Sequence, residues 1–141
     1  MSNTITGQAQ IVPNLSVRGG KAAIEFYQTA FGAVELFRIE APDGGGVFAE
    51  LSIQGARFFL ADESPAHGNL SPASLGGISV RIDLLVDDPD ALQARAVAAG
   101  AREISPVRDE EEGPRMGVVE DPFGHRWLIG GHWTGQKSDE A

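Results

Sequence analysis

Two stretches, Gln54-Gly-Ala-Arg-Phe-Phe-Leu-Ala61 and Phe123-Gly-His-Arg-Trp-Leu-Ile-Gly130, follow one pattern. Each has a turn glycine, one variable residue, an arginine, three bulky apolar residues and a small residue. Their glycines are 69 positions apart, and Ala30-Phe-Gly-Ala-Val-Glu-Leu36 matches Ala98-Ala-Gly-Ala-Arg-Glu-Ile104 at an offset of 68. A repeat over most of the chain predicts two copies of a half-domain that is too small to hold its own core. The seam between the paired copies is a natural place for a pocket.

The composition fits one globular domain. The chain has 141 residues, of which 42% are hydrophobic and 22% charged, and this leaves room for one core. Its start has neither a basic segment nor an apolar run, and no apolar stretch approaches the roughly 20 residues that span a bilayer. We therefore expect a cytoplasmic protein with no membrane partner. Because there is no cysteine, disulfides, Cys-zinc sites and thiolate catalysis are excluded.

The chain is acidic, with a formal net charge of −9. Phosphate binding needs a basic surface, so the charge argues against a nucleic-acid partner. Much of the acidity is local, in the run Asp109-Glu-Glu-Glu112, in Asp87, Asp88 and Asp90, and in Asp139-Glu140. Acidic loops that keep the protein soluble are one interpretation, and an acidic rim that gathers cationic ligands is the other. We expect the run 109–112 to lie at the mouth of the cavity.

Apolar periodicity predicts the same order of elements in both halves. The first half has a helix that ends at Gly32, and the second has a helix capped by Asp88 and Pro89 and closed by Gly100. The helices are expected over 20–31 and about 89–99, and the strands over 11–17, 34–40, 47–53, 57–61, 78–86, 102–105, 116–120 and 126–129.

The predicted fold class is α+β. Two paired β-α-β-β-β modules form a cupped mixed sheet around a concave cavity, with the helices on the outside. All 141 residues belong to this single domain, with module one at about 11–62, a loop at 63–77, module two at about 78–133 and a flexible tail at 134–141.

Alternation along the strands assigns side chains to the two faces of each sheet. The face beside the helices should carry the apolar set: Pro13, Leu15, Val17, Ala49, Leu51, Ile53, Phe58, Leu60, Val80, Ile82, Leu84, Val86, Trp127 and Ile129. The opposite face mixes charges, hydroxyl groups and aromatic rings, which suits a small organic molecule. The candidate ligand-binding residues on this inner face are Asn14, Ser16, Phe48, Glu50, Arg57, Phe59, Arg81, Asp83, Arg126 and Leu128. Alternatively, Arg81 and Asp83 form a salt bridge that fills a closed barrel.

The paired modules, together with Ala23-Ile-Glu-Phe-Tyr27, Phe31-Gly32-Ala33 and Asp121-Pro-Phe-Gly-His125, resemble the vicinal oxygen chelate superfamily. It includes glyoxalases, bleomycin-resistance proteins and extradiol dioxygenases. The likeness runs from about residue 11 to residue 133 and implies a small-molecule ligand and a homodimer that encloses ligands in two grooves. Further motifs look like the PhnB-like branch, which has no single activity to transfer: Pro42-Asp-Gly44, Phe48-Ala-Glu-Leu51, Leu60-Ala-Asp-Glu63, Ser71-Pro72, Leu75-Gly-Gly77 and Val97-Ala-Ala-Gly-Ala101.

Catalytic members of this superfamily typically hold a divalent metal with His and Glu side chains from the first and last strand of each module. Through the repeat, these positions fall near Val12, Phe59, Arg81 and Leu128, and none of these side chains can bind a metal. PhnB-like sequences often carry a histidine where this chain has Phe48. We therefore expect no metal site of the usual kind and no cofactor.

The three histidines are not expected to supply a metal site. We expect His67 to be a solvated loop residue and His125 to have a hydrogen-bonded structural role. His132 could approach a dimer interface.

Three hypotheses remain for the function. The first is a metal-free, small-molecule-binding protein with Phe48, Phe59 and Leu128 as apolar wall and with Glu50, Arg81, Asp83 and Arg126 as polar anchors. The second is a lyase, isomerase or dioxygenase-type enzyme, in which Glu50 and Asp83 hold a non-standard metal or one of them is a general base. The third is an interaction module whose pocket is a filled core. The identity of the ligand does not follow from the fold.

Overall fold

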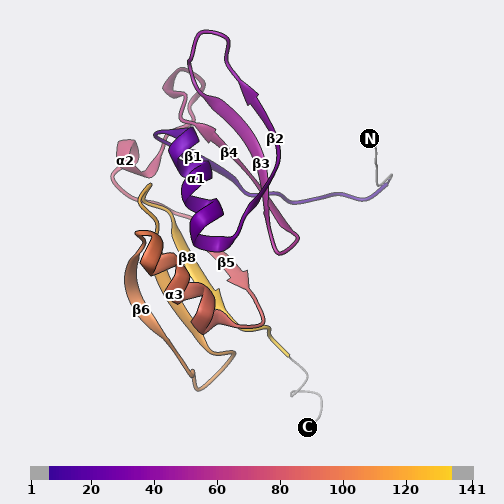
Figure 1. The fold of residues 1–141 in the computed structure, drawn as a ribbon, viewed down its shortest axis with the longest axis vertical. Coiled ribbons are helices and arrows are strands. Elements are labelled where there is room, and N and C mark those ends of the chain that lie inside the picture. The colour runs from indigo at the N-terminus through magenta and orange to yellow at the C-terminus, as the bar shows by residue number, and fades with distance from the viewer. Residues whose placement is uncertain (1–6, 135–141) are drawn as a thin grey trace.

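The computed structural model describes residues 7–134, which form two similar halves (Figure 1). Asp139-Glu140 and residues 135–141 of the predicted tail lie outside the described residues. The elements in chain order are β1 (Asn14–Val17), α1 (Gly20–Phe31), β2 (Val34–Glu40), β3 (Val47–Ile53), β4 (Ala56–Asp62), the 3-10 helix η1 (Pro65–His67), α2 (Pro72–Leu75), β5 (Ile82–Leu85), α3 (Pro89–Ala99), β6 (Arg102–Arg108), β7 (Met116–Glu120) and β8 (Arg126–Gly130).

Each half contains a four-stranded sheet, and the two sheets have the same topology. Their strand orders are β1-β4-β3-β2 and β5-β8-β7-β6, and in each the first pair is parallel and the others antiparallel. In register, Asn14 pairs with Phe59 in the first sheet and Asp83 pairs with Leu128 in the second. The duplication predicted from the sequence is therefore confirmed.

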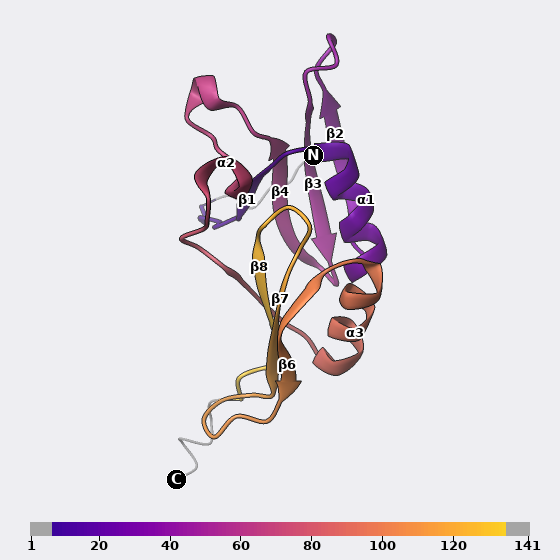
Figure 2. The same cartoon turned by 90° about the vertical axis from the view of Figure 1, so that its left-hand side faces the viewer.

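The helices cover one side of the two sheets. Figure 2 shows α1 and α3 end to end on one side, and η1 and α2 on the other. The two helices contact each other and hold the modules together. The α+β class, the cupped sheets and the outer helices are as predicted. No helix within residues 7–134 combines the length and the apolar character that crossing a membrane requires.

Both long helices end where the sequence predicts. Gly32 has a left-handed φ of 69° and its N–H bonds to the carbonyl groups of the last turn of α1. In α3 the Asp88 carboxylate accepts a hydrogen bond from the backbone N–H of Ala91, 3.1 Å away, and Pro89 occupies the first turn. Gly100 closes α3 through bonds to the carbonyl groups of Ala96 and Val97.

The start of α1 is capped from a distance. Gly19 offers no side chain, so the carboxylate of Asp62 at the end of β4 accepts hydrogen bonds from Gly19 N, Gly20 N and Val47 N, at 3.1, 2.8 and 2.7 Å. A negative charge at a helix N-terminus is favourable. Gly20 is needed here because a Cβ atom would lie 2.6 Å from an oxygen of Asp62.

Three strand boundaries differ from the prediction by three residues or more. β1 begins at Asn14 and β5 at Ile82, so Val12, Val80 and Arg81 lie outside the sheets. Val80 is 69% exposed and is not part of the helix-side face. The reason is that β8 begins only at Arg126, opposite Arg81, which leaves Val80 without a strand residue to pair with. β6 extends to Arg108, beyond its predicted end, by means of two register shifts.

The core lies between the helices and the sheets. Its largest fully buried side chains include Trp127, Tyr27 and Phe31, and the rings of Phe31 and Trp127 are 4.8 Å apart. Trp127 is 1% exposed, which confirms its predicted place in the core. Because Tyr27 and Phe31 come from module one and Trp127 from module two, one aromatic core joins the two modules.

The motif Asp121-Pro-Phe-Gly-His125 builds a polar link inside this core. Asp121 is 3% exposed, and its Oδ2 accepts hydrogen bonds from Tyr27 Oη at 2.5 Å and from Trp127 Nε1 at 2.9 Å. Its Oδ1 accepts from the backbone N–H groups of Phe123 and His125, at 2.9 and 3.0 Å. Burial, and then the charge of Asp121, raise the pKa of Tyr27 well above its usual value. The buried Asp121 carboxylate thus accepts four hydrogen bonds, which satisfies both of its oxygens.

His125 also ties the modules together. Its Nε2–H donates to the carbonyl oxygen of Ser16 in β1, 2.9 Å away. This is the structural role predicted for His125. His67 is exposed and bonds to Ser64, as expected of a loop residue, and His132 is exposed and bonds to Asp87.

Candidate functional site

The inner face of module one carries a row of aromatic rings. Strand register places Phe37 beside Glu50, Glu50 beside Phe59, and Phe59 beside Asn14. The ring centroids of Phe37 and Phe48 are 5.8 Å apart, and those of Phe48 and Phe59 are 5.3 Å apart. The row crosses β2, β3 and β4 on the side away from α1. Such a surface can stack against a planar apolar molecule.

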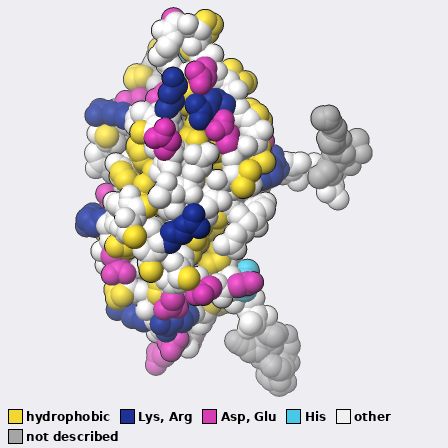
Figure 3. Space-filling view, viewed as in Figure 1, with side chains coloured by type: hydrophobic (Ala, Val, Ile, Leu, Met, Phe, Trp, Pro, Cys, Tyr) yellow, Lys and Arg dark blue, Asp and Glu magenta, His cyan; other side chains and the backbone are white. Residues whose placement is uncertain are grey.

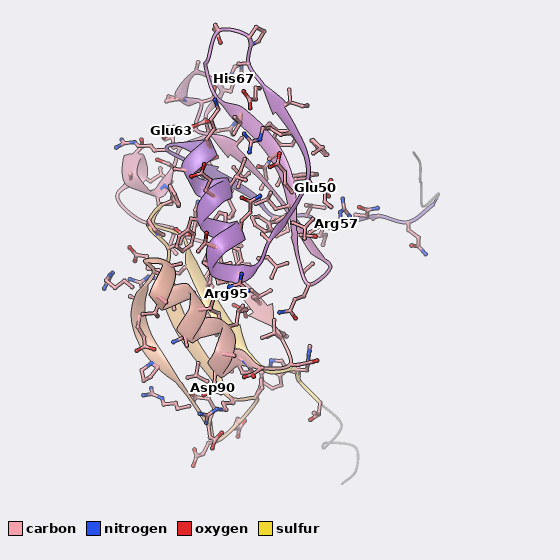
Figure 4. The ribbon with its side chains drawn as sticks, in the orientation of Figure 1. Glu50, Arg57, Glu63, His67, Asp90 and Arg95 are labelled. Atoms are coloured by element: carbon pink, nitrogen blue, oxygen red, sulfur yellow. The ribbon has the colours of Figure 1, made fainter. Side chains whose placement is uncertain are left out.

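Glu50 and Arg57 form an ion pair beside the aromatic row (Figure 4). Glu50 is only 8% exposed, and Arg57 Nε donates to its carboxylate. Arg57 Nη1 also donates to Gln10, 2.9 Å away, so the guanidinium links β4 to the segment before β1. Because the buried carboxylate already has a cationic partner, the pair is a polar anchor with little net charge.

The inner face of module two is less apolar. Leu128 is buried and lies beside Asp83 in register. Arg81 Nε is 3.2 Å from Asp83 Oδ1, but the two side chains are 56% and 51% exposed. The pair therefore lies at an exposed sheet edge and does not fill a closed barrel.

The predicted site residues fall into two groups, one in each module. Asn14, Ser16, Phe48, Glu50, Arg57 and Phe59 belong to module one, and Arg81, Asp83, Arg126 and Leu128 belong to module two. In the described part of the chain, residues 7–134, no strand pairing joins the two sheets. Glu50 and Asp83, which the enzyme hypothesis needs together, thus belong to different sheets.

The residues at the superfamily's metal positions do not fit a metal ion. The resemblance puts these positions near Val12, Phe59, Arg81 and Leu128, and the register adds Asn14 beside Phe59 and Asp83 beside Leu128. One amide, one carboxylate and two hydrocarbon side chains make a poor donor set for zinc or iron, which usually take histidine, cysteine or several carboxylates. Within residues 7–134, no three or more His, Cys, Asp or Glu side chains are grouped so that they could hold a metal.

A pocket of about 710 Å³ lies at the junction of the two modules. It is lined by Arg18 at the end of β1, by residues of the segment 72–78 and by residues of the β7–β8 turn. Of the ten predicted ligand-binding residues, Arg126 alone lines it. The repeat predicted a pocket at this seam, but sequence reasoning missed Arg18 and Phe123. The pocket wall formed by the segment 72–78 did carry a signal in the sequence, because this loop is rich in Pro, Gly and Ser.

The segment that carries α2 is fixed by Glu63. The Glu63 carboxylate accepts hydrogen bonds from Ser71 N at 2.8 Å, from Ser74 Oγ at 2.8 and 3.0 Å, and from Arg18 Nε at 3.1 Å. Arg18 Nη2 also donates to Ser74 Oγ, 3.0 Å away. The hydrogen bonds from Ser71 and Ser74 lower the pKa of Glu63 to about 2. This wall of the pocket is therefore held in a defined position.

The acidic run 109–112 does not lie at this pocket. It belongs to the β6–β7 connection, at the end of module two that is farther from module one (Figure 2). Arg115 binds Asp90 there with two bonds of 2.7 and 2.8 Å and Asp109 with a third of 3.1 Å. In Figure 4, Asp90 beside this run and Glu63 beside the pocket lie in different modules. The run therefore lies away from this junction pocket, and its place at the mouth of the inner-face cavity stays a prediction.

A family model supports the resemblance seen in the sequence. The model described as the Glyoxalase/Bleomycin resistance protein/Dioxygenase superfamily matches residues 7–129. The chain belongs to this superfamily. An uncharacterised protein of Mycobacterium tuberculosis is 43% identical to this chain over 129 residues. The match covers 89% of this chain and 76% of the relative.

Solved structures agree with the fold. The structure of TioX from Micromonospora sp. ML1 has a TM-score of 0.69 and 27% identity, with 89% of this chain and 99% of the other covered. A gene product of Arabidopsis thaliana has a TM-score of 0.65 and 31% identity, with 86% and 95% covered. Both share the two-module arrangement with this superfamily member.

Proposed function

We propose that this member of the superfamily is a small-molecule-binding protein that lacks the usual metal site and acts as a homodimer. The observation that carries the proposal is the open inner face of module one. Phe37, a ring of the aromatic row, is 41% exposed, and Val34 and Ile39 in the same strand are 57% and 61% exposed. An apolar face with a single buried ion pair suits an apolar ligand with few polar groups.

A second copy of the chain is the proposed cover for this face. Apolar side chains in a continuous patch are unfavourable in water and usually mark a binding surface. Figure 3 shows the opposite, helix-bearing side, on which acidic and basic side chains are interspersed, as on a solvated surface. A two-fold dimer would bring the inner face of one copy against the other and enclose the ligand between them.

No comparable observation supports the enzyme hypothesis or the interaction-module hypothesis. The carboxylates that an enzyme would need already pair with arginines, Glu50 with Arg57 and Asp83 with Arg81. An interaction module with a filled core agrees poorly with a 710 Å³ pocket. The PhnB-like likeness and the cytoplasmic location remain predictions.

The proposal can be tested by a thermal-shift screen of small aromatic and alicyclic compounds. Compounds that stabilise the protein should lose most of their effect in Phe59→Ala, because the variant removes one ring of the aromatic row. Leu75→Ala is the matched control, since Leu75 is an apolar residue of α2 that is 61% exposed. Failure of every compound to stabilise the protein, or equal losses in both variants, would contradict the proposed function.

A further inference from the structure

The pocket at the junction of the two modules has an arginine on each side. Arg18 comes from the end of β1 in module one and Arg126 from the start of β8 in module two. We propose that this junction pocket binds the anionic end of a small, partly apolar molecule, with Arg18 and Arg126 as its anchors. The inference goes beyond the proposed function, because this pocket is separate from the inner face of module one.

The pocket has the size and lining of a small-molecule site. Its volume of about 710 Å³ falls in the usual range for such sites, roughly 300 to 1,000 Å³. Phe123, Pro72 and Ile78 supply apolar wall, and the polar lining consists of the guanidinium groups of Arg18 and Arg126 and the carboxylate of Glu120. A molecule with an apolar body and one charged end can therefore use both parts of the lining.

Arg126 keeps donors available for a ligand. Within residues 7–134 its hydrogen bonds are made by Nε alone, to Glu120 Oε1 at 3.2 Å. The same oxygen accepts from Arg102 Nη2, also at 3.2 Å, so one carboxylate serves two guanidinium groups. The two Nη groups of Arg126 can therefore donate hydrogen bonds to a ligand carboxylate, whose two oxygens match the planar fork of arginine.

The carboxylates near the pocket are already committed. Glu63 accepts from Ser71, Ser74 and Arg18, and these bonds hold the α2 segment. Of the charged residues that line the pocket, Arg18 and Arg126 are cationic and Glu120 is anionic, which leaves the lining with a formal charge of +1. An anionic group is favoured over a cationic one, because charges lining a site decide which partners it accepts.

Binding can be located by following backbone amide signals in the full-length protein. The probes are three compounds of one shape that differ in charge: 2-naphthoate, 2-naphthamide and 2-naphthylmethylamine. Naphthoate should shift the amide signals of Gly76, Gly77 and Gly124, which line the pocket, more than those of Phe48 and Leu128 on the inner faces. It should also bind more tightly than the amide and the amine.

Variants of the two arginines test the anchors. Arg126→Gln and Arg18→Gln should each weaken naphthoate binding about tenfold and leave naphthamide binding nearly unchanged. Arg126→Lys, which keeps the charge but not the planar fork, should fall between Arg126→Gln and the unmodified protein. Arg115→Gln is the matched control, because Arg115 is 42% exposed, close to the 41% of Arg126, and is also ion-paired, but it lies outside the pocket. It should change naphthoate affinity by less than about twofold.

The outcomes separate this inference from the proposed function. Naphthoate signals confined to Phe48 and Leu128, equal binding of the three probes, or an equal loss in Arg115→Gln would overturn the junction pocket as an anion site. So would a lack of naphthoate binding when the thermal-shift screen has found other ligands. In each of these cases the small-molecule-binding function stands, whereas a screen without any ligand removes the function itself.

Discussion

Tyr27 of module one donates its hydroxyl hydrogen bond to Asp121 of module two, inside the core that the two modules share. Asp121 also accepts from Trp127 and from two backbone N–H groups. The motif Asp121-Pro-Phe-Gly-His125, one of those that carry the resemblance to the superfamily, thus joins the two modules.

Substitutions in this link should lower stability by different amounts. Tyr27→Phe removes one donor and should cost about 1–2 kcal/mol in the free energy of unfolding. Asp121→Ala leaves several buried donors without an acceptor and should cost about 3–5 kcal/mol. Urea unfolding measures both. A cost below about 1 kcal/mol for Asp121→Ala would contradict the role of the link.

Glu63 should titrate far below an ordinary glutamate. Its pKa is lowered to about 2 in the folded protein from a usual 4.5, mainly by hydrogen bonds from Ser71 and Ser74. Because the folded pKa is depressed, its stabilising contribution is present above pH 4.5 and is lost as the pH falls from 4.5 through about 2. The chemical shift of the Ser71 amide, followed against pH, should have its midpoint near pH 2.

The Glu63→Gln variant is the test of that assignment. It should remove the low-pH transition of the Ser71 amide and reduce the loss of stability in acid. Glu25→Gln is the control, since Glu25 is exposed on α1 and makes no hydrogen bond to a described side chain. A Ser71 midpoint near 4.5 in the unmodified protein would show that the carboxylate is not held as described.

The purified protein should carry little transition metal. The donor set Asn14, Phe59, Asp83 and Leu128 does not suit zinc, nickel, manganese or iron, so elemental analysis should find less than about one tenth of an equivalent of each. Near-stoichiometric metal that survives dialysis and is lost in Glu50→Gln would overturn the metal-free proposal.

Light scattering should give twice the mass of one chain. Phe37→Asp should shift the protein toward monomers, because it places a charge in the middle of the proposed apolar interface. Leu75→Asp puts the same charge on an exposed apolar residue of α2 and should leave the dimer intact. If the unmodified protein is a monomer at micromolar concentration, the proposal of a ligand groove shared by two copies is contradicted.

Much of the fold could be predicted because local signals are strong in this chain. The bounds of α1, β2 and β3 follow from apolar spacing and from glycines at the helix ends, such as Gly32. The start of β5 could not be predicted, because it depends on where its partner β8 begins. Apolar alternation continues through Val80, but no paired strand extends that far.

The candidate site could be predicted only in part. Strand alternation correctly put Phe48, Glu50 and Phe59 on one face, because a face depends only on local periodicity. The junction pocket depends on how the modules pack and on how Glu63 holds the α2 segment. Those contacts join residues far apart in the chain, so neither Arg18 nor Phe123 carried a local signal.

The central claim is that a small molecule binds the open inner face of module one, and a crystal structure with the most stabilising compound of the thermal-shift screen tests it most directly. Electron density for the compound should lie against Phe48 and Phe59, with a second copy of the chain covering it. The account would be contradicted if the face were packed by protein side chains or if the compound lay away from it.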